Sequence, residues 1–232
     1  MKTIGLIGGM SWESTANYYQ IINREVKARL GGLHSGKVCL YSVDFAEIET
    51  LQHQGRWGDT ASILSQAAKS VEAGGADFIL ICTNTMHKVA DQIQQAVDVP
   101  LVHIADATAE KLVADGVKKV GLLGTRFTME QDFYKQRLID KFGVEVVVPS
   151  VDDQTIVHEV IYNELCRGEV REDSRQQYLA IIDNLVEEGA EAVILGCTEI
   201  AMLVEPQHTG VKLYDTTEIH AKAAVEFALN KS

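Results

Sequence analysis

The stretch Phe78-Ile-Leu-Ile-Cys82-Thr-Asn-Thr85 decides the fold, because a related stretch, Val193-Ile-Leu-Gly-Cys197-Thr-Glu199, returns later in the chain. Each is a short apolar run that ends on a cysteine, followed by a threonine and a polar residue. The two cysteines lie 115 residues apart, which is about half of the 232-residue chain. We therefore interpret the chain as two related halves, each of which supplies one thiol.

Two further pairs of segments support this interpretation. Ile4-Gly-Leu-Ile-Gly8 is similar to Val120-Gly-Leu-Leu-Gly124 at a spacing of 116 residues. Gly75-Ala-Asp77 precedes the first cysteine strand, and Gly189-Ala-Glu191 precedes the second. An internal duplication explains spacings that agree within one residue. The alternative is that unrelated α/β sheets share a general pattern of apolar strands ending on glycine.

Apolar strands alternate with helical segments along the chain, which predicts an α/β fold with parallel sheets covered on both faces. We expect two pseudo-symmetric Rossmann-like domains with central parallel sheets and an active site in the interdomain cleft. The first domain should contain residues 1–100 plus 211–232, closed by the C-terminal helix that returns after the second half. The second domain should contain residues 101–210.

The predicted elements follow from apolar periodicity, glycine stops and capping residues. Strands are expected at 2–8, 38–43, 77–81, 101–104, 120–124, 144–148, 192–195 and 212–214. Helices are expected at 12–30, 59–73, 86–97, 107–115, 129–142, 153–166, 172–188 and 217–229, with Ser11 as the N-cap of the first. A polar connection is expected at 44–56.

Composition limits the class of partner. The formal net charge is −12 and 46% of the residues are apolar, so a nucleic-acid or anionic-membrane surface, which requires clustered Lys and Arg, is not expected. The chain begins without a leader pattern, and no apolar run approaches the length of a membrane span. These features predict a cytoplasmic protein with a small-molecule partner.

The four cysteines indicate free thiols rather than a disulfide scaffold or a metal centre. None has a second Cys or a His at zinc-site spacing, so no metal site is predicted. Cys39 and Cys166 lack any site context, and packing is the expected role for both.

Cys82 and Cys197 each stand where an apolar strand ends and a helix begins. Ligands bind at this edge of open α/β sheets, and a helix N-terminus favours thiolate over thiol. The alternative is a packed, inert cysteine, which is common at the end of a buried strand. Because two related positions carry a thiol beside polar residues, we favour a pair of reactive cysteines.

The chain resembles the cofactor-independent aspartate/glutamate racemases, which are related to glutamate, hydantoin and other amino-acid racemases. Ile4-Gly-Leu-Ile-Gly-Gly-Met10, Cys82-Thr-Asn-Thr85 and Gly196-Cys-Thr-Glu199 are similar to the three signature segments of that family. Gly124-Thr125 is similar to its second glycine turn. The stretches Gly-Gly-Met-Ser-Trp-Glu-Ser and Cys-Thr-Asn-Thr-Met-His-Lys are similar to those of the enterobacterial broad-specificity racemases.

The resemblance implies an amino-acid racemase that needs no cofactor and works by two bases. Cys82 and Cys197 are then the catalytic residues: one thiolate removes the α-proton while the opposite thiol donates one. Hydrogen bonds to the substrate carboxylate in a dry cleft must stabilise the carbanion. Family members are commonly dimers, so we expect a homodimer, for which Trp12, Tyr18 and Tyr19 could supply an interface or could belong to the core.

The resemblance also implies a set of substrate contacts. These residues are Gly9, Met10, Gln52, Asn84, Thr85, Thr125, Thr198 and Glu199. The chain departs from the family at the residues that read the substrate side chain, since the arginine and lysine of aspartate racemases are absent at their usual places. Gln52, Arg56 or Arg167 could substitute for them. Glu199 stands where glutamate racemases have a histidine, so that branch's acid–base partner is not carried over.

Other functions stay open. Within the superfamily, a hydantoin racemase, a maleate isomerase or a decarboxylase is the alternative, although decarboxylation needs only one cysteine. A non-catalytic protein that binds a small anion or nucleotide is disfavoured, because neither G-x-G-x-x-G nor a Walker A sequence is present. A pyridoxal enzyme is disfavoured too, because no lysine stands in a recognisable Schiff-base context.

Overall fold

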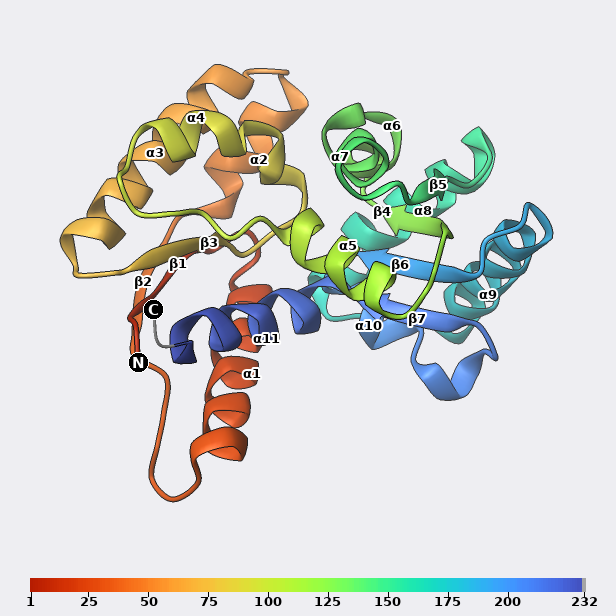
Figure 1. Ribbon diagram of the computed structural model, residues 1–232. Coiled ribbons are helices and arrows are strands. Elements are labelled where there is room, and N and C mark those ends of the chain that lie inside the picture. Colours follow the sequence, from red (N-terminus) through yellow and green to blue (C-terminus); the bar gives the residue numbers. More distant parts are fainter. Residues whose placement is uncertain (231–232) are drawn as a thin grey trace. The chain divides into compact units, whose positions relative to one another are not determined.

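The computed structural model describes residues 1–230 of the chain, which forms two compact units (Figure 1). The first unit contains residues 1–104 and the C-terminal segment from His220, and the second contains residues 105–219. The chain therefore passes between the units twice, after Ile104 and after Ile219. Each unit is built around one parallel sheet, so the predicted fold class is confirmed.

The two units and the predicted domains place residues 101–104 and 211–219 differently. Strand β7 (Lys212–Asp215), which we had assigned to the first domain, pairs with β6 (Ala192–Gly196) in the sheet of the second unit. β7 has only four residues, Lys-Leu-Tyr-Asp, and so short a stretch does not tell which sheet a parallel strand will join. Most of the C-terminal helix, from His220 onward, belongs to the first unit.

The sheet of the first unit has the order β2–β1–β3. These strands are β2 (Val38–Ser42), β1 (Ile4–Gly8) and β3 (Phe78–Ile81). The strand expected at 101–104 is reduced to a single parallel bridge between Leu101 and Ile79.

Helices cover both faces of this sheet. They are α1 (Trp12–Leu30), α2 (Phe45–His53), α3 (Trp57–Ala73), the 3₁₀ turn η1 (Thr85–Val89), α4 (Ala90–Gln95) and α11 (Thr216–Leu229). One apolar cluster joins Ile7, Ile79 and Ile81 to α3 and α4, and another joins Leu6, Leu80 and their neighbours to α1 and α11. Neighbouring residues of a strand belong to different clusters because successive side chains point to opposite faces of the sheet. Figure 1 shows α1 and α11 together on one side of the sheet.

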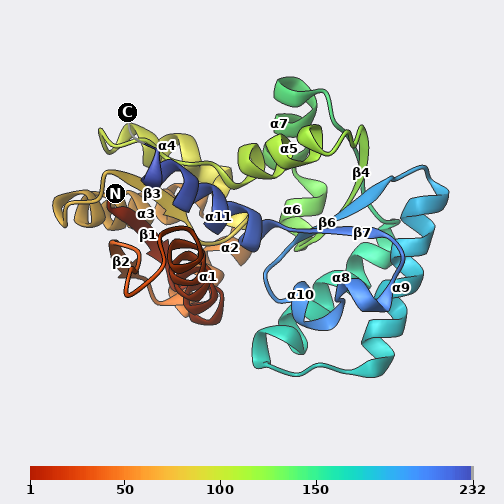
Figure 2. The same ribbon diagram turned by 60° about the horizontal axis from the view of Figure 1, so that its bottom comes forward.

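The sheet of the second unit has the order β5–β4–β6–β7. The other two strands are β5 (Glu145–Val147) and β4 (Lys119–Gly124). The helices and 3₁₀ turns are α5 (Ile104–Ala114), α6 (Arg126–Glu130), α7 (Asp132–Phe142), α8 (Val151–Asn163), η2 (Leu165–Arg167), α9 (Glu172–Glu187), α10 (Ile200–Leu203) and η3 (Pro206–His208). Figure 2 shows α8 and α9 on one side of β4 and β6 and α5 and α7 on the other.

Local sequence explains where the elements begin and end. The Ser11 hydroxyl accepts the Ser14 N–H at 3.2 Å and caps α1, and Gly31, at a φ of 73°, ends the helix as predicted. The predicted polar connection at 44–56 is wrong, because the Asp44 side chain caps α2. The helix expected at 129–142 is interrupted at Gln131, where an extended backbone separates α6 from α7.

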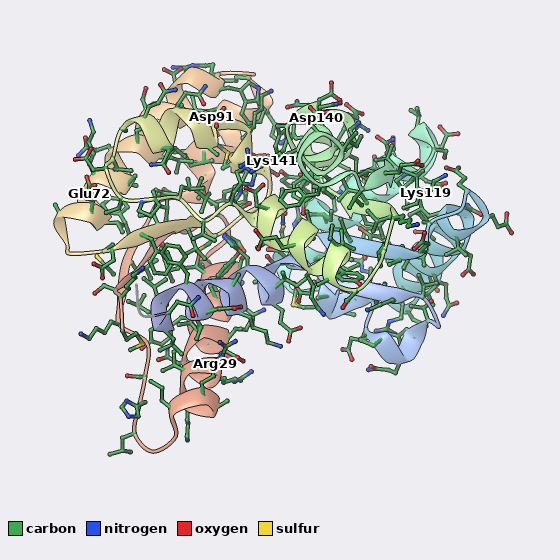
Figure 3. The ribbon with its side chains drawn as sticks, viewed as in Figure 1. Arg29, Glu72, Asp91, Lys119, Asp140 and Lys141 are labelled. Atoms are coloured by element: carbon green, nitrogen blue, oxygen red, sulfur yellow. The ribbon has the colours of Figure 1, made fainter. Side chains whose placement is uncertain are left out.

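Charged side chains lie on the outer faces of the helices. In Figure 3, Arg29 points away from α1 and Asp91 away from α4, and both side chains are exposed. Among residues 1–230, no helix is both long and apolar enough to cross a membrane.

Candidate active site

The predicted contacts of the first unit gather at one edge of its sheet. Gly9 and Met10 follow β1, and Asn84 and Thr85 follow β3. Because β1 and β3 are parallel neighbours, their carboxyl ends lie at the same edge. Met10, Asn84 and Thr85 are at most 5% exposed, so this edge is a protected polar environment.

Gly9 forms a tight turn that only glycine can fill. Its φ is 92°, and a Cβ atom there would lie 2.2 Å from the carbonyl oxygen of Val43. The Gly9 N–H donates to the Thr15 hydroxyl at 2.8 Å, which ties the turn to the start of α1.

Gln52 lies on α2 and is buried. Its Nε2 donates to the sulfur of Met86 at 2.9 Å, whereas Oε1 has no hydrogen-bond partner among residues 1–230. A buried acceptor without a donor costs free energy. A ligand N–H that reached this oxygen would remove that cost, so the environment of Gln52 fits the predicted substrate contact.

Cys82 belongs to the apolar core of the first unit. Its side chain has no exposed surface and packs on the face that α1 and α11 cover, with Leu6, Leu80 and Tyr18. Burial raises the pKa of the Cys82 thiol far above its usual range. This environment opposes the thiolate that we expected from the sequence. The catalytic role of Cys82 stays a prediction.

Cys197 has a different environment at the end of β6. The thiol is partly buried, and its Sγ donates a hydrogen bond to the carboxylate of Glu199 at 2.9 Å. Burial and then the negative charge of Glu199 raise the pKa of Cys197 well above its ordinary value. These two effects oppose the expected lowering by a helix N-terminus, and α10 has only four residues.

Two hydroxyls accompany Cys197 in the second unit. Thr125 follows β4 and caps α6 by accepting the Thr128 N–H. The Thr198 hydroxyl lies 2.9 Å from that of Thr217, at the start of α11. Because β4 and β6 are parallel neighbours, Thr125, Cys197, Thr198 and the buried Glu199 lie at the same edge of this sheet.

The strand registers correct the proposed equivalence of the two cysteines. Ile4 pairs with Phe78 in the first sheet, and its counterpart Val120 pairs with Ala192 in the second. The same alignment matches the Ile79–Leu101 bridge with the Val193–Leu213 pair. Along these strands Cys82 then corresponds to Gly196.

Thr83 is consequently the counterpart of Cys197. Thr83 is also partly exposed, whereas Cys82 is not. Sequence comparison missed Thr83 because both stretches contain Cys-Thr, and aligning those letters shifts one strand by a residue. Such a shift exchanges the two faces of a strand.

Two of the arginines that could meet a substrate side chain already have partners within the protein. Arg56, which we considered for the substrate side chain, donates to Asp59 at 2.6 Å and is more than half exposed. Arg167 lies in η2. Arg126, directly after Thr125, was missed by sequence reasoning; its guanidinium donates to Thr155 at 3.0 Å.

Within residues 1–230, no group of three or more His, Cys, Asp or Glu side chains is arranged to hold a metal ion.

Comparison with known proteins gives the same family as the motifs. The sequence pattern of the Asp/Glu/hydantoin racemases matches residues 7–224, which confirms the resemblance. The chain is 55% identical to a putative Asp/Glu racemase from Yersinia pestis, whose crystal structure superimposes with a TM-score of 0.93 over 99% of this chain and 100% of that one.

Two other proteins show the spread of the similarity. An aspartate racemase homologue from Pyrococcus horikoshii is 36% identical, with a TM-score of 0.86 over 99% of this chain and 100% of that chain. The broad-specificity amino-acid racemase RacX from Bacillus subtilis is 24% identical over 96% of both chains.

Proposed function

Since the chain belongs to the Asp/Glu/hydantoin racemase family, we propose that it racemises an amino acid by exchanging the α-proton without a cofactor. The observation that carries the proposal is the Cys197 thiol at the ligand edge of its sheet, with its proton directed at the Glu199 carboxylate 2.9 Å away. A similar protein from Bacillus subtilis is a broad-specificity amino-acid racemase, and a putative Asp/Glu racemase from Yersinia pestis shares the fold.

The mechanism uses one acid–base group on each face of the α-carbon. Cys197 serves one face, and a residue at the carboxyl end of β3 serves the other. Peptide N–H groups and hydroxyls of Asn84, Thr85, Thr125 and Thr198 bind the substrate carboxylate. Their hydrogen bonds stabilise the charge that develops on it when the α-proton leaves.

Two residues are candidates for the second acid–base group. Cys82 is the residue predicted from the sequence. Thr83 is the one that the strand registers align with Cys197, and it is the more exposed of the two. A hydroxyl at Thr83 can donate a proton to a carbanion, although it is a poorer base than a thiolate.

Glu199 and the substrate together control the charge of Cys197. In the free protein the thiol is protonated, because burial and the neighbouring carboxylate both oppose the thiolate. A substrate ammonium group beside Glu199 would offset that negative charge and lower the pKa of the thiol. The thiolate base would thus be favoured when substrate is bound, with the thiol proton released to solvent and Glu199 remaining ionised.

Racemisation of a panel of single-enantiomer amino acids, followed by chiral chromatography, tests the proposal. Wild-type protein should invert at least one substrate, and Cys197→Ala should lower the rate about a thousandfold, because one of the two acid–base groups is missing. Cys39→Ala is the matched control and should retain activity. Inversion by Cys197→Ala at the wild-type rate would refute the role of this thiol.

The same panel addresses the substrate side chain. An acidic substrate would need a cation, and Arg56 is bound to Asp59 in the free protein. The Gln52 amide is neutral and suits a polar or ammonium group. Initial rates for Asp and Glu against neutral amino acids would separate these classes.

We also propose a homodimer formed through one face of α1. Trp12 and Tyr19 are 68% and 53% exposed and lie seven residues apart, which places them on the same helix face, whereas Tyr18 is in the core. Sedimentation analysis should show a dimer that Trp12→Glu with Tyr19→Glu converts to a monomer. A monomeric wild-type chain would contradict the proposal.

We also propose that the protein is cytoplasmic, as predicted from the sequence.

A further inference from the structure

Three histidines are clustered in the interior of the first unit. His87, His103 and His220 are buried, and the ring of His87 lies 4.4 Å from that of His103 and 5.9 Å from that of His220, measured between centroids. The racemisation chemistry described above uses none of them. Their hydrogen bonds show what two of these rings connect.

His87 bridges the turn after β3 and the beginning of α5. Its Nδ1 lies 2.8 Å from the carbonyl oxygen of Thr83, and a carbonyl can only accept, so Nδ1 carries the hydrogen. Its Nε2 therefore has a free lone pair, which accepts the Ile104 N–H at 3.2 Å. A neutral imidazole thus joins two backbone positions that are 21 residues apart.

His220 makes the complementary connection. Its Nε2 lies 2.8 Å from the carbonyl oxygen of Val102, so this nitrogen carries the hydrogen. Its Nδ1 then accepts the hydroxyl hydrogen of Tyr18 at 2.8 Å. The neutral ring of His220 therefore links α11, the segment before Ile104 and α1.

These rings occupy both places at which the chain passes between the units. The first passage follows Ile104, whose N–H is bound to His87, and the second ends at His220. Val102 connects the two sets of bonds, because it lies two residues before Ile104 and accepts from His220. Two pairs of hydrogen bonds, joined by the backbone of residues 102–104, thus connect Tyr18 with Thr83.

The hydrogen bond from His87 to the Thr83 carbonyl affects the proposed active site. The Thr83 carbonyl and the Asn84 N–H belong to the same peptide group, so a bond to the oxygen fixes the direction of the N–H. It also polarises the peptide and makes the N–H a stronger donor. Asn84 is one of the groups that we expect to hold the substrate carboxylate.

We propose that His87 and His220 form a hinge clamp, a pair of neutral imidazoles that ties both passages of the chain to the turn at 83–85 and positions its peptide groups. His87 is a positioning residue, since it acts through Thr83 and Asn84. The effect on rate rests on the proposed function, whereas the mechanical coupling does not. Hydrogen exchange measures that coupling without substrate.

Amide hydrogen–deuterium exchange of the full-length protein, read by mass spectrometry, tests the coupling. Tyr18→Phe removes one hydroxyl that bonds to His220 and preserves the ring. We expect faster exchange at 218–222 and 101–106, and also at 83–88, because the clamp transmits the change from His220 through Val102 and Ile104 to His87.

Tyr178→Phe is the matched control. Tyr178 is also fully buried, and its hydroxyl donates to the Val157 carbonyl at 2.8 Å, away from both passages. Exchange in this variant should rise near Val157 only. If Tyr18→Phe raised the exchange rate only within α1, or raised it equally at all amides, the clamp would be refuted.

A second pair of variants tests the bond to Thr83. His87→Leu removes both the donor and the acceptor, whereas His87→Gln keeps one of each. We expect His87→Leu to lower kcat about tenfold, corresponding to the loss of one hydrogen bond, and His87→Gln to restore most of it. Equal kcat in the two variants would overturn the positioning role. If the expected exchange pattern were found but the wild-type protein racemised no amino acid, the clamp would be supported and the proposed function would be refuted.

Discussion

At the scale of single residues, two candidates for the second acid–base group lie at the carboxyl end of β3. Cys82 faces the apolar core, and Thr83 aligns with Cys197. We predict that Thr83→Ala abolishes racemisation, whereas Cys82→Ala retains it and lowers the free energy of unfolding by about 1 kcal/mol, because a small apolar group is lost from the core. Chiral chromatography and urea denaturation measure both effects. The opposite result would restore Cys82 as the acid–base group.

Glu199 should control the ionisation of Cys197. Glu199→Gln removes the carboxylate charge, which is one cause of the raised pKa of the thiol, so the pKa should fall. The midpoint of iodoacetamide alkylation against pH, followed on the Cys197 peptide, should therefore move to lower pH. Glu187→Gln, on the exposed side of α9, is the control and should leave the midpoint in place. An unchanged midpoint in Glu199→Gln would show that the carboxylate does not act on this thiol.

His220 should make stability depend on pH. Burial lowers its pKa from 6.5 to about 4, so between these values the unfolded chain binds a proton that the folded chain does not. Stability should fall as the pH drops from 6.5 towards 4, by about 3 kcal/mol in total. The groups facing the ring are Tyr18 and His87.

Urea denaturation of wild type and His220→Gln at several pH values checks this dependence. The difference in free energy between the two proteins should shrink as the pH falls, because only the wild type loses this stabilisation. His34→Gln, at an exposed histidine, should remain parallel to wild type. A constant difference between wild type and His220→Gln would contradict the assignment.

At the scale of elements, sequence periodicity predicts most strands and helices but not the register between strands. The apolar runs identify β1, β3, β4 and β6 directly, because buried parallel strands are apolar on both faces. The pairing of Ile4 with Phe78 and of Val120 with Ala192 depends on side chains packed from both faces, which local sequence does not encode. The confusion between Cys82 and Thr83 follows from that limit.

The glycines of the two central strands should differ in their tolerance of a methyl group. A Cβ at Gly5 would lie 2.4 Å from Val71 and 2.9 Å from the Phe78 carbonyl oxygen, which is backbone. At Gly121 the nearest atom, at 2.9 Å, is the flexible end of Leu185. Gly5→Ala should therefore cost about 1–3 kcal/mol of stability.

Gly121→Ala serves as the internal comparison, since Gly121 occupies the position in β4 that Gly5 occupies in β1. We expect it to cost less than Gly5→Ala in thermal or urea denaturation, because a side chain can rotate away more easily than backbone can move. Equal losses of stability would show that the two strands are packed alike.

At the scale of the whole molecule, each unit includes a helix that lies in the sequence next to the sheet of the other unit. Helix α5 comes directly after the strands of the first sheet in the sequence, yet almost all of it belongs to the second unit. Helix α11 comes directly after the strands of the second sheet, yet most of it belongs to the first unit. The return of α11 was predictable from the C-terminal position of its apolar segment. The second domain expected from the sequence, residues 101–210, already contained α5, whereas residues 101–104 remain with the first unit, where Leu101 bridges to Ile79.

Proton exchange in deuterium oxide, started separately from each enantiomer of the best substrate, tests the central claim most directly. The account predicts that the wild type places deuterium at the α-carbon of the product whichever enantiomer is supplied, and that Cys197→Ala forms inverted product about a thousandfold more slowly. Inversion that retains the original α-proton, or continued inversion by Cys197→Ala at the wild-type rate, would contradict it.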